Sequence, residues 1–273
     1  MSSLRILTIG DSHGRKPILA KKLIKKYNPD ILVCTGDLAY SDKVRKEIFS
    51  HWKELTEEDK TLSELIGKKK NIKIQTEAAK SMDGILKYMN SLGKPVFLIY
   101  GNNDYLRREI KDLKLKAKGI EDLVKKYKNI KLMTASKAKV NGYNLLAVSG
   151  YRRTNTITNK EVNQDSHGKK FNKLFKYIKG KSIILYHDVP FGTKLDLIKN
   201  KMSPLNGTHA GSKVIRNIVK KHKPLLYICG HVHENPGVIK LYKTVCLNTG
   251  SIEHNDYYII NINDNKIRIN RVK

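Results

Sequence analysis

Five short apolar runs, each ending in a polar cluster, constrain the fold of this chain more than any other feature. They are rich in β-branched and aliphatic residues, a composition typical of buried strands. The runs are Leu4 to Gly10, Ile31 to Gly36, Pro95 to Gly101, Ser182 to Tyr186 and Leu225 to Gly230. The sequence therefore predicts a sheet-based core.

Helical patterns separate these strands. Residues 16–27 have Pro17 near their start and apolar residues at helical spacing, which predicts a helix between the first two strands and hence parallel pairing. A longer helical stretch, at about residues 43–92 and broken near 67–71, exceeds what a crossover between strands requires. We expect this stretch to be an insertion that forms a cap or a dimer contact.

The rest of the chain completes a mixed α/β protein. No repeat, proline-rich linker or low-complexity tail divides it, so residues 1–273 are predicted to form a single domain. The remaining predictions are a surface helix at Arg107 to Lys128 interrupted at Gly119, a strand at Tyr143 to Ser149, a loop at Arg152 to Gly168, and antiparallel strands at Tyr257 to Ile262 and Lys266 to Val272 joined through Asn263 to Asn265.

Residues of types that commonly bind metal ions follow all five apolar runs. They are Asp11, His13, Asp37, Asn102, His187, His231 and His233. Each of them alone has an ordinary explanation, as a helix cap or as a hydrogen-bonded histidine. The carboxyl ends of strands in an open α/β fold meet at one edge, however, so we expect all seven to lie together.

The spacing of these residues supports a metal site. In Asp11-Ser12-His13 and His231-Val232-His233, an i, i+2 separation in extended backbone would place both side chains on the same side. An aspartate has two oxygens and can bridge two cations, while imidazole and amide groups complete the coordination without adding charge.

The ordered motifs resemble the calcineurin-like metallophosphoesterase family. The matching motifs are Asp11-Ser12-His13, Gly36-Asp37, Gly101-Asn102-Asn103-Asp104, the lone His187, and Gly230-His231-Val232-His233. They extend over the chain from Leu4 to about Ser251, and the stretch Gly207 to Ser212 is similar to a prokaryotic, archaeal-type phosphodiesterase branch.

The resemblance implies a four-layer αββα sandwich of mixed sheets flanked by helices. It also implies two divalent metal ions, with a hydroxide that bridges them attacking phosphorus in line. One ion would be held by Asp11, His13, Asp37 and His233, and the other by Asp37, Asn102, His187 and His231. The absence of a thiolate ligand favours manganese, iron or zinc over softer ions, and we expect manganese.

The chain departs from the family pattern at Asn103. The family has a histidine here, which protonates the leaving group and which a carboxylate at the place of Asp104 orients; an amide cannot deliver that proton. Three interpretations are open. The substrates have good leaving groups or are strained cyclic diesters; His209, or alternatively His254, supplies the proton; or the protein is a metal-binding scaffold with little activity.

The net charge of +29 indicates an affinity for polyanions, either nucleic acid or phosphorylated substrates, although a lysine-rich solvated surface explains it equally well. No signal peptide or membrane-spanning stretch is present, and the three cysteines are dispersed within apolar runs, so we expect a cytoplasmic protein with buried thiols. The favoured function is a phosphodiesterase. The alternatives are a phosphomonoesterase or protein phosphatase, a nuclease, and a scaffold that binds nucleic acid.

Overall fold

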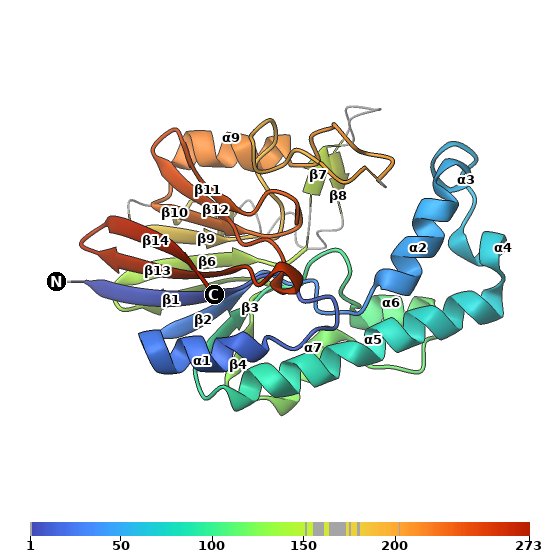
Figure 1. Cartoon of the computed structure of the whole chain (residues 1–273), viewed down its shortest axis with the longest axis horizontal. Helices are drawn as coiled ribbons and strands as arrows, with labels where there is room; N and C mark the ends of the chain where they lie inside the picture. Colours follow the sequence, from blue (N-terminus) through green and yellow to red (C-terminus); the bar gives the residue numbers. More distant parts are fainter. Residues whose placement is uncertain are drawn as a thin grey trace.

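Two six-stranded sheets pack face to face at the centre of the molecule, and helices cover their outer faces (Figure 1). The computed structural model describes residues 2–150, 152–154, 161–163, 173, 174, 176–178, 181–201 and 203–273. In spatial order, the first sheet contains β14 (Lys266–Val272), β13 (Tyr257–Asn263), β1 (Ser3–Ile9), β2 (Ile31–Cys34), β3 (Val96–Leu98) and β4 (Ile130–Leu132). The second contains β11 (Gly237–Leu241), β12 (Thr244–Asn248), β10 (Leu226–Cys229), β9 (Ser182–Leu185), β6 (Tyr143–Val148) and β5 (Ala135–Val140).

Three hydrophobic clusters correspond to the three interfaces between four layers. In β1, Leu7 and Ile9 face the helices α1 (Ile18–Tyr27), α5 (Lys68–Ser91) and α7 (Ile120–Leu123), whereas Leu4 and Ile6 face the second sheet. A third cluster packs α9 (Lys213–His222) on the outer face of the second sheet. Because the central strands are buried on both faces, they are mostly apolar. The predicted four-layer αββα sandwich is confirmed.

The first three apolar runs of the sequence form neighbouring parallel strands. β1 pairs with β2 in parallel, with Ile6 opposite Ile31, and the connecting helix α1 ends at Asn28 in the left-handed conformation. β2 then pairs in parallel with β3, and in the second sheet β9 and β10 are also parallel. The sites that follow these strands therefore lie at the carboxyl ends of both sheets.

The long helical stretch consists of α2 (Asp42–Ser50), α3 (Trp52–Glu57), α4 (Leu62–Ile66) and α5. Gly67, with φ of 82°, separates α4 from α5, where the sequence predicts a break. α5 has a buried apolar face on the first sheet, whereas α2, α3 and α4 have no buried residue and project from the body (Figure 1). That this stretch is an insertion or a dimer contact stays a prediction.

Two segments differ from the prediction. The helix expected at 107–128 is three short pieces, α6 (Arg107–Asp112), α7 and a 3₁₀ turn (Val124–Lys126), because Lys114 is left-handed and the backbone at Gly119 lies against Arg107. The loop expected at 152–168 contains an antiparallel pair, β7 (Arg152–Thr154) and β8 (Glu161–Asn163). The remainder of that loop, and the side chains of these two strands, lie outside the described residues.

Two smaller predictions are confirmed. β13 and β14 form an antiparallel hairpin whose turn residues, Asp264 and Asn265, both have positive φ, as a two-residue turn of this kind requires. All three cysteines are free and buried, and burial raises the pKa of the Cys246 thiol to about 12. Among the described helices, none has the length and apolar character that crossing a bilayer needs.

Candidate metal centre

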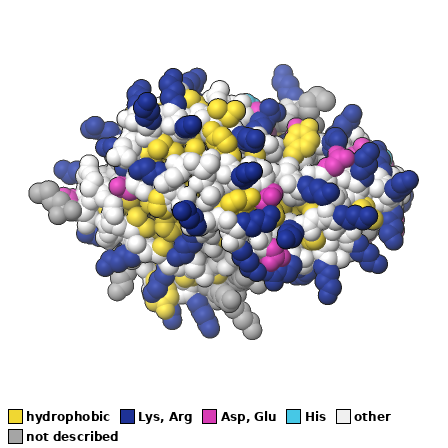
Figure 2. Space-filling view, turned by 90° about the horizontal axis from the view of Figure 1, so that it is seen from below, with side chains coloured by type: hydrophobic (Ala, Val, Ile, Leu, Met, Phe, Trp, Pro, Cys, Tyr) yellow, Lys and Arg dark blue, Asp and Glu magenta, His cyan; other side chains and the backbone are white. Residues whose placement is uncertain are grey.

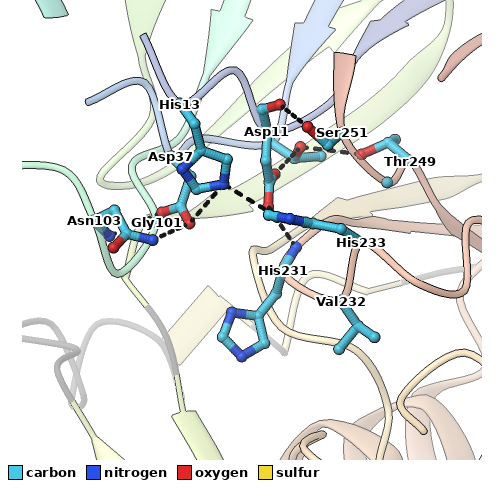
Figure 3. A network of polar contacts seen from close by, with 12 residues as sticks. Asp11, His13, Asp37, Gly101, Asn103, His231, Val232, His233, Thr249 and Ser251 are labelled. Atoms are coloured by element: carbon cyan, nitrogen blue, oxygen red, sulfur yellow. Dashed lines mark hydrogen bonds and ion pairs between the residues drawn. The ribbon is translucent and has the colours of Figure 1, made fainter. Parts of the chain in front are cut away.

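The candidate site lies where strands of both sheets end. Asp11 follows β1, Asp37 follows β2 and Asn102 follows β3 in the first sheet, and three histidines follow β9 and β10 in the second. Asp11 and Asp37 are 0% and 1% exposed, so neither carboxylate is solvated by bulk water. Figure 3 shows these carboxylates facing the rings of His13 and His233.

The ligand atoms of Asp11, His13 and His233 all lie within 4.8 Å of one another. The Nε2 atoms of the two histidines are 3.1 Å apart, and Nε2 of His233 is 3.0 Å from Oδ2 of Asp11. Nδ1 of His13 contacts the hydroxyl of Ser41 at 3.1 Å, so Nε2 is the ring atom directed at the cluster. This arrangement suits one cation bound between the two rings and the carboxylate.

A second group, Asp11, Asp37 and His187, also has ligand atoms within 4.8 Å of one another. Asn102 and His231 adjoin it, because Oδ1 of Asn102 lies 2.9 Å from Nε2 of His187 and 2.9 Å from Nδ1 of His231. The two groups share Asp11, and Asp37 lies between them, because its Oδ2 is 3.9 Å from Nε2 of His13 and its Oδ1 is 3.6 Å from Nε2 of His187. The structure thus brings all seven predicted ligands into one cluster.

The hydrogen bonds of His187 test whether these residues fit a cation. Its Nδ1 lies 2.8 Å from the backbone carbonyl of Thr35, which can only accept, so Nδ1 carries a proton. In the neutral ring, Nε2 is then an acceptor, and it faces another acceptor, Oδ1 of Asn102. A proton on Nε2 of His187 or a cation can occupy the position between these two atoms, and the carboxylate, imidazole and amide groups around it are types that bind metal ions, so the residues fit a metal ion.

The charges of the site also favour a bound cation. Burial lowers the pKa of His187, but the nearby carboxylates of Asp37 and Asp11 outweigh it and raise that pKa to about 9. Burial also lowers the pKa of His233, and its hydrogen bond to Asp11 and that carboxylate's charge reverse the effect. The carboxylates therefore favour a positive charge at this point, which two divalent ions would supply.

His13 differs from the other two histidines. Burial is the main cause that lowers its pKa, to about 3; the charges of His233 and Arg45 act in the same direction, and Asp37 opposes them. The ring is consequently neutral at physiological pH, and neutral imidazole is the form that binds metal ions.

Backbone geometry corrects one step of the sequence argument. His13, Asp37 and His231 have φ of 43°, 50° and 72°, so these residues adopt left-handed and not extended backbone. Asp11 and His13 still meet, but a turn brings them together, and His231 and His233 contact different parts of the cluster. Left-handed backbone at non-glycine residues costs about 1–3 kcal/mol each and is concentrated at functional sites.

Supporting residues around Asp11 were not predicted. Oδ1 of Asp11 accepts a hydrogen bond from the Thr35 hydroxyl at 3.0 Å, and the Thr249 hydroxyl lies 3.0 Å from that of Thr35. The backbone carbonyl of Asp11 accepts from the Ser251 hydroxyl at 2.9 Å (Figure 3). Threonine within an apolar run carries no local signal of this role, since its partner is distant in the sequence.

Asn103 lies directly on the cluster. Its side-chain amide donates to Oδ2 of Asp37 at 2.6 Å, and its backbone amide donates to Oδ1 of the same carboxylate at 2.9 Å (Figure 3). Both donors fix the orientation of Asp37. Asn103 also lines the cavity above the cluster, where the family pattern has a histidine.

Asp104 contacts the backbone of the loops that carry the ligands, and a catalytic role for it stays a prediction. Its carboxylate accepts hydrogen bonds from the backbone amides of Leu38, Ala39 and Gly101, so it joins the loops that follow β2 and β3. Burial and the charge of Asp37 raise the pKa of Asp104 to about 7. Its role is to hold the two ligand-bearing loops in register.

The structure does not place His209 or His254 at the cavity. Nδ1 of His209 lies 2.9 Å from the buried carboxylate of Asp196, and its ring packs against Phe191. His254 ends a 3₁₀ turn and is exposed. Neither is among the described residues that line the cavity. Neither of these two histidines therefore lies where it could replace the family's histidine, whose position Asn103 occupies.

A cavity of about 250 Å³ opens above the cluster. Its floor consists of cluster residues. One wall comes from α2 and α3 and consists of Arg45, Ile48, Phe49 and Trp52. The segment after β9 contributes Ile198, Asn200, Ser203, Leu205 and Ala210, and Glu234 completes the lining.

The positive charge is dispersed. Figure 2 shows lysine and arginine side chains spread over the visible face, with few acidic residues among them. They do not form a single stripe on this face. A dispersed basic surface attracts anions in general, and affinity for nucleic acid stays a prediction.

The cluster brings together residues that could hold metal ions, and comparisons place the chain in a family. Residues 1–272 match the model of the metallophosphoesterases of the calcineurin superfamily. The chain therefore belongs to this family, whose members depend on two metal ions. No curated protein matches the sequence.

Solved structures with the same fold are distant in sequence. One crystal structure superposes with a TM-score of 0.70 at 19% identity, over 99% of this chain and 100% of the other. The protein TT1561 of Thermus thermophilus gives a TM-score of 0.59 at 13% identity, over 100% of both chains. A dimetal phosphatase from Danio rerio gives 0.55 at 8% identity, over 99% of this chain and 96% of that one. These similarities establish the fold.

Proposed function

We propose that this metallophosphoesterase is a phosphodiesterase that uses two divalent metal ions. Asp11, His13, Asp37 and His233 would hold one ion, and Asp37, Asn102, His187 and His231 the other. The observation that supports this most strongly is the convergence of buried carboxylates and imidazoles, whose ligand atoms lie within 4.8 Å of one another in each of two groups that share Asp11. We expect manganese as the metal, with iron or zinc as alternatives, and a cytoplasmic location.

The bound ions would supply an activated water and positive charge for the phosphate oxygens. The residues of the chain orient that reaction. Asn103 and Asp104 fix Asp37 and its loop, and Thr35 fixes Asp11, so the carboxylates keep one geometry before a substrate arrives. Phosphoryl transfer depends mainly on such positioning and on electrostatic stabilisation.

The preference for diesters rests on Asn103. An amide at this position can donate a hydrogen bond to a phosphate oxygen, but it cannot protonate a departing alkoxide near neutral pH. General acid catalysis contributes about 100- to 10,000-fold, and good leaving groups need it least. The enzyme should therefore act on diesters with stable leaving groups, or on strained cyclic diesters.

The test compares substrates that differ in their leaving group. Wild-type protein reconstituted with Mn²⁺ should hydrolyse bis(p-nitrophenyl) phosphate faster than p-nitrophenyl phosphate, and a dinucleotide slowly, because its leaving group is an alkoxide. Asn103→His should raise turnover of the dinucleotide by about 100-fold or more, with a smaller change on the nitrophenyl diester. Asn270→His, on the exposed part of β14, is the matched control and should change neither rate.

Two further variants test the ligand assignment. Asp37→Asn and His187→Ala should abolish metal-dependent turnover while the protein remains folded by circular dichroism. Unchanged turnover in either variant refutes the proposed site. Binding of two metal ions without turnover of any ester would instead indicate the metal-binding scaffold, and faster turnover of the monoester would indicate a phosphomonoesterase.

A further inference from the structure

An apolar and basic stripe on the projecting helices faces the cavity above the metal centre. Arg45, Ile48, Phe49 and Trp52 have the i, i+3, i+4, i+7 spacing of one helical face, and all four line the cavity. Such a face normally packs on a protein core. Here none of the four is buried, and none of the three apolar ones belongs to a hydrophobic cluster of the described residues.

The two aromatic rings of the stripe form an open corner. Phe49 and Trp52 have ring centroids 6.3 Å apart at an interplanar angle of 69°, so their faces are not stacked on each other. Trp52 is the only tryptophan among the 273 residues, and it is half-buried at this cavity. A tryptophan that is neither a core residue nor stacked on a neighbour presents a flat apolar surface to a ligand.

Arg45 connects this aromatic corner with the metal centre. Its guanidinium lies 5.8 Å from the ring centroid of Phe49, and it lines the same cavity as His13 and His233. Among the described residues it forms no ion pair with a carboxylate. A half-buried cation without a carboxylate partner, beside a phosphoesterase centre, suits an anionic group of the ligand.

The segment after β9 supplies the rest of the lining. Ile198 and Leu205 add aliphatic surface, and Asn200 and Ser203 add polar groups. Glu234 is the one further carboxylate of the lining outside the metal cluster. A ligand in this cavity therefore meets an aromatic corner, aliphatic and polar side chains, one cation and the metal centre.

We propose that this stripe is a subsite for the base of a nucleotide, and that the substrates are nucleotide diesters of the kind inferred above, with a stable leaving group or a strained cyclic phosphate. The base would stack on Trp52 and meet the ring of Phe49 with its edge, and Arg45 would contact the phosphate as it enters the metal centre. Stacking of bases on aromatic side chains tolerates any sequence, because each base has an aromatic face. The inference rests on the proposed phosphodiesterase function, and it adds the class of substrate.

The single tryptophan provides a direct measurement that does not depend on turnover. Stacking of a purine on Trp52 should quench the intrinsic fluorescence of the Mn²⁺-loaded protein, with excitation at the red edge of indole absorption. We expect AMP to quench saturably and ribose 5-phosphate, which has no base, to leave the signal unchanged. Phe49→Leu should weaken AMP binding by about 2- to 12-fold, the range for loss of an edge-to-face aromatic contact.

Phe191→Leu is the matched control, because Phe191 packs on His209 and does not line the cavity. It should bind AMP as the wild type does. Equal quenching by ribose 5-phosphate, or equal weakening by the two phenylalanine variants, overturns the base subsite.

Fluorescence and hydrolysis separate this proposal from the proposed function. Hydrolysis of bis(p-nitrophenyl) phosphate without quenching by AMP would refute the base subsite and leave the phosphodiesterase intact. Quenching by AMP without hydrolysis of any diester would refute the enzyme and support a nucleotide-binding site.

Discussion

Replacing Gly101 by alanine should inactivate the enzyme with only moderate loss of stability. A Cβ atom at this position would lie 2.5 Å from Cε1 of His187, and it would contact Oδ1 of Asp37 even more closely. Ordinary contacts begin at about 3.4 Å, so these two side chains must move by about 1 Å. Both are predicted metal ligands.

The magnitudes follow from this displacement. Extra volume in a packed site costs about 1–3 kcal/mol of folding free energy, which a chain of this size tolerates. A misplacement of about 1 Å in catalytic geometry costs about 100-fold in rate. We therefore expect kcat on bis(p-nitrophenyl) phosphate to fall by about 100-fold or more at saturating Mn²⁺, while urea unfolding remains cooperative.

Gly84→Ala is the matched control. Gly84 lies within α5, and apart from its chain neighbours and the adjacent backbone of that helix no atom lies within 4 Å of the Cβ that alanine would add. Alanine is favoured over glycine in a helix interior by about 1 kcal/mol, so this variant should be slightly more stable and fully active. If Gly101→Ala keeps wild-type activity, or if the two variants change activity equally, the close packing around the centre is not what positions the ligands.

Three further predictions test the centre and the surface. Thr35→Val should lower metal affinity measured by calorimetry and leave circular dichroism unchanged, because Asp11 loses its hydroxyl donor at 3.0 Å; unchanged affinity would exclude this support. Mn²⁺ at about 100 times its Kd should stabilise the protein by about 2.7 kcal/mol, and a chelator should reverse the gain; an unchanged melting temperature counts against a folded-state site. Arg107 and Lys125 lower the pKa of Asp122 from 3.8 to about 2, so its contribution is full above pH 3.8 and is lost as the pH falls through about 2. Asp122→Asn should thus destabilise by less than about 1 kcal/mol at pH 7, measured by urea unfolding, and the difference should shrink by pH 3; a constant difference would refute this pairing.

The layered fold and the members of the metal cluster were accessible from the sequence. Apolar runs without alternation indicated strands buried on both faces, and each of the five occurs in the structure as a strand of one of the two sheets. The ligand residue types directly follow these strands. Since parallel strands end at a common edge, local patterns sufficed to bring Asp11, Asp37 and Asn102 together.

The roles of neighbouring residues required the tertiary structure. Thr35, in the loop after β2, supports Asp11, and His209 contacts a buried carboxylate and not the cavity, although its glycine-rich loop suggested a site residue. Asp104 accepts hydrogen bonds from three backbone amides, whereas in the family the carboxylate at this place orients a histidine. These partners are separated by many residues, and no local periodicity encodes them.

By itself, the sequence determined which segments are buried and which side chains end them, because burial and turn formation depend on residues close together in the chain. Only the tertiary structure decided that β13 near the C-terminus pairs with β1, and that the stripe on α2 and α3 faces the metal centre and not the core. The stripe has the same helical spacing as a core-facing helix. Its partner depends on where α5 and the segment after β9 lie in space, which is a property of long-range packing.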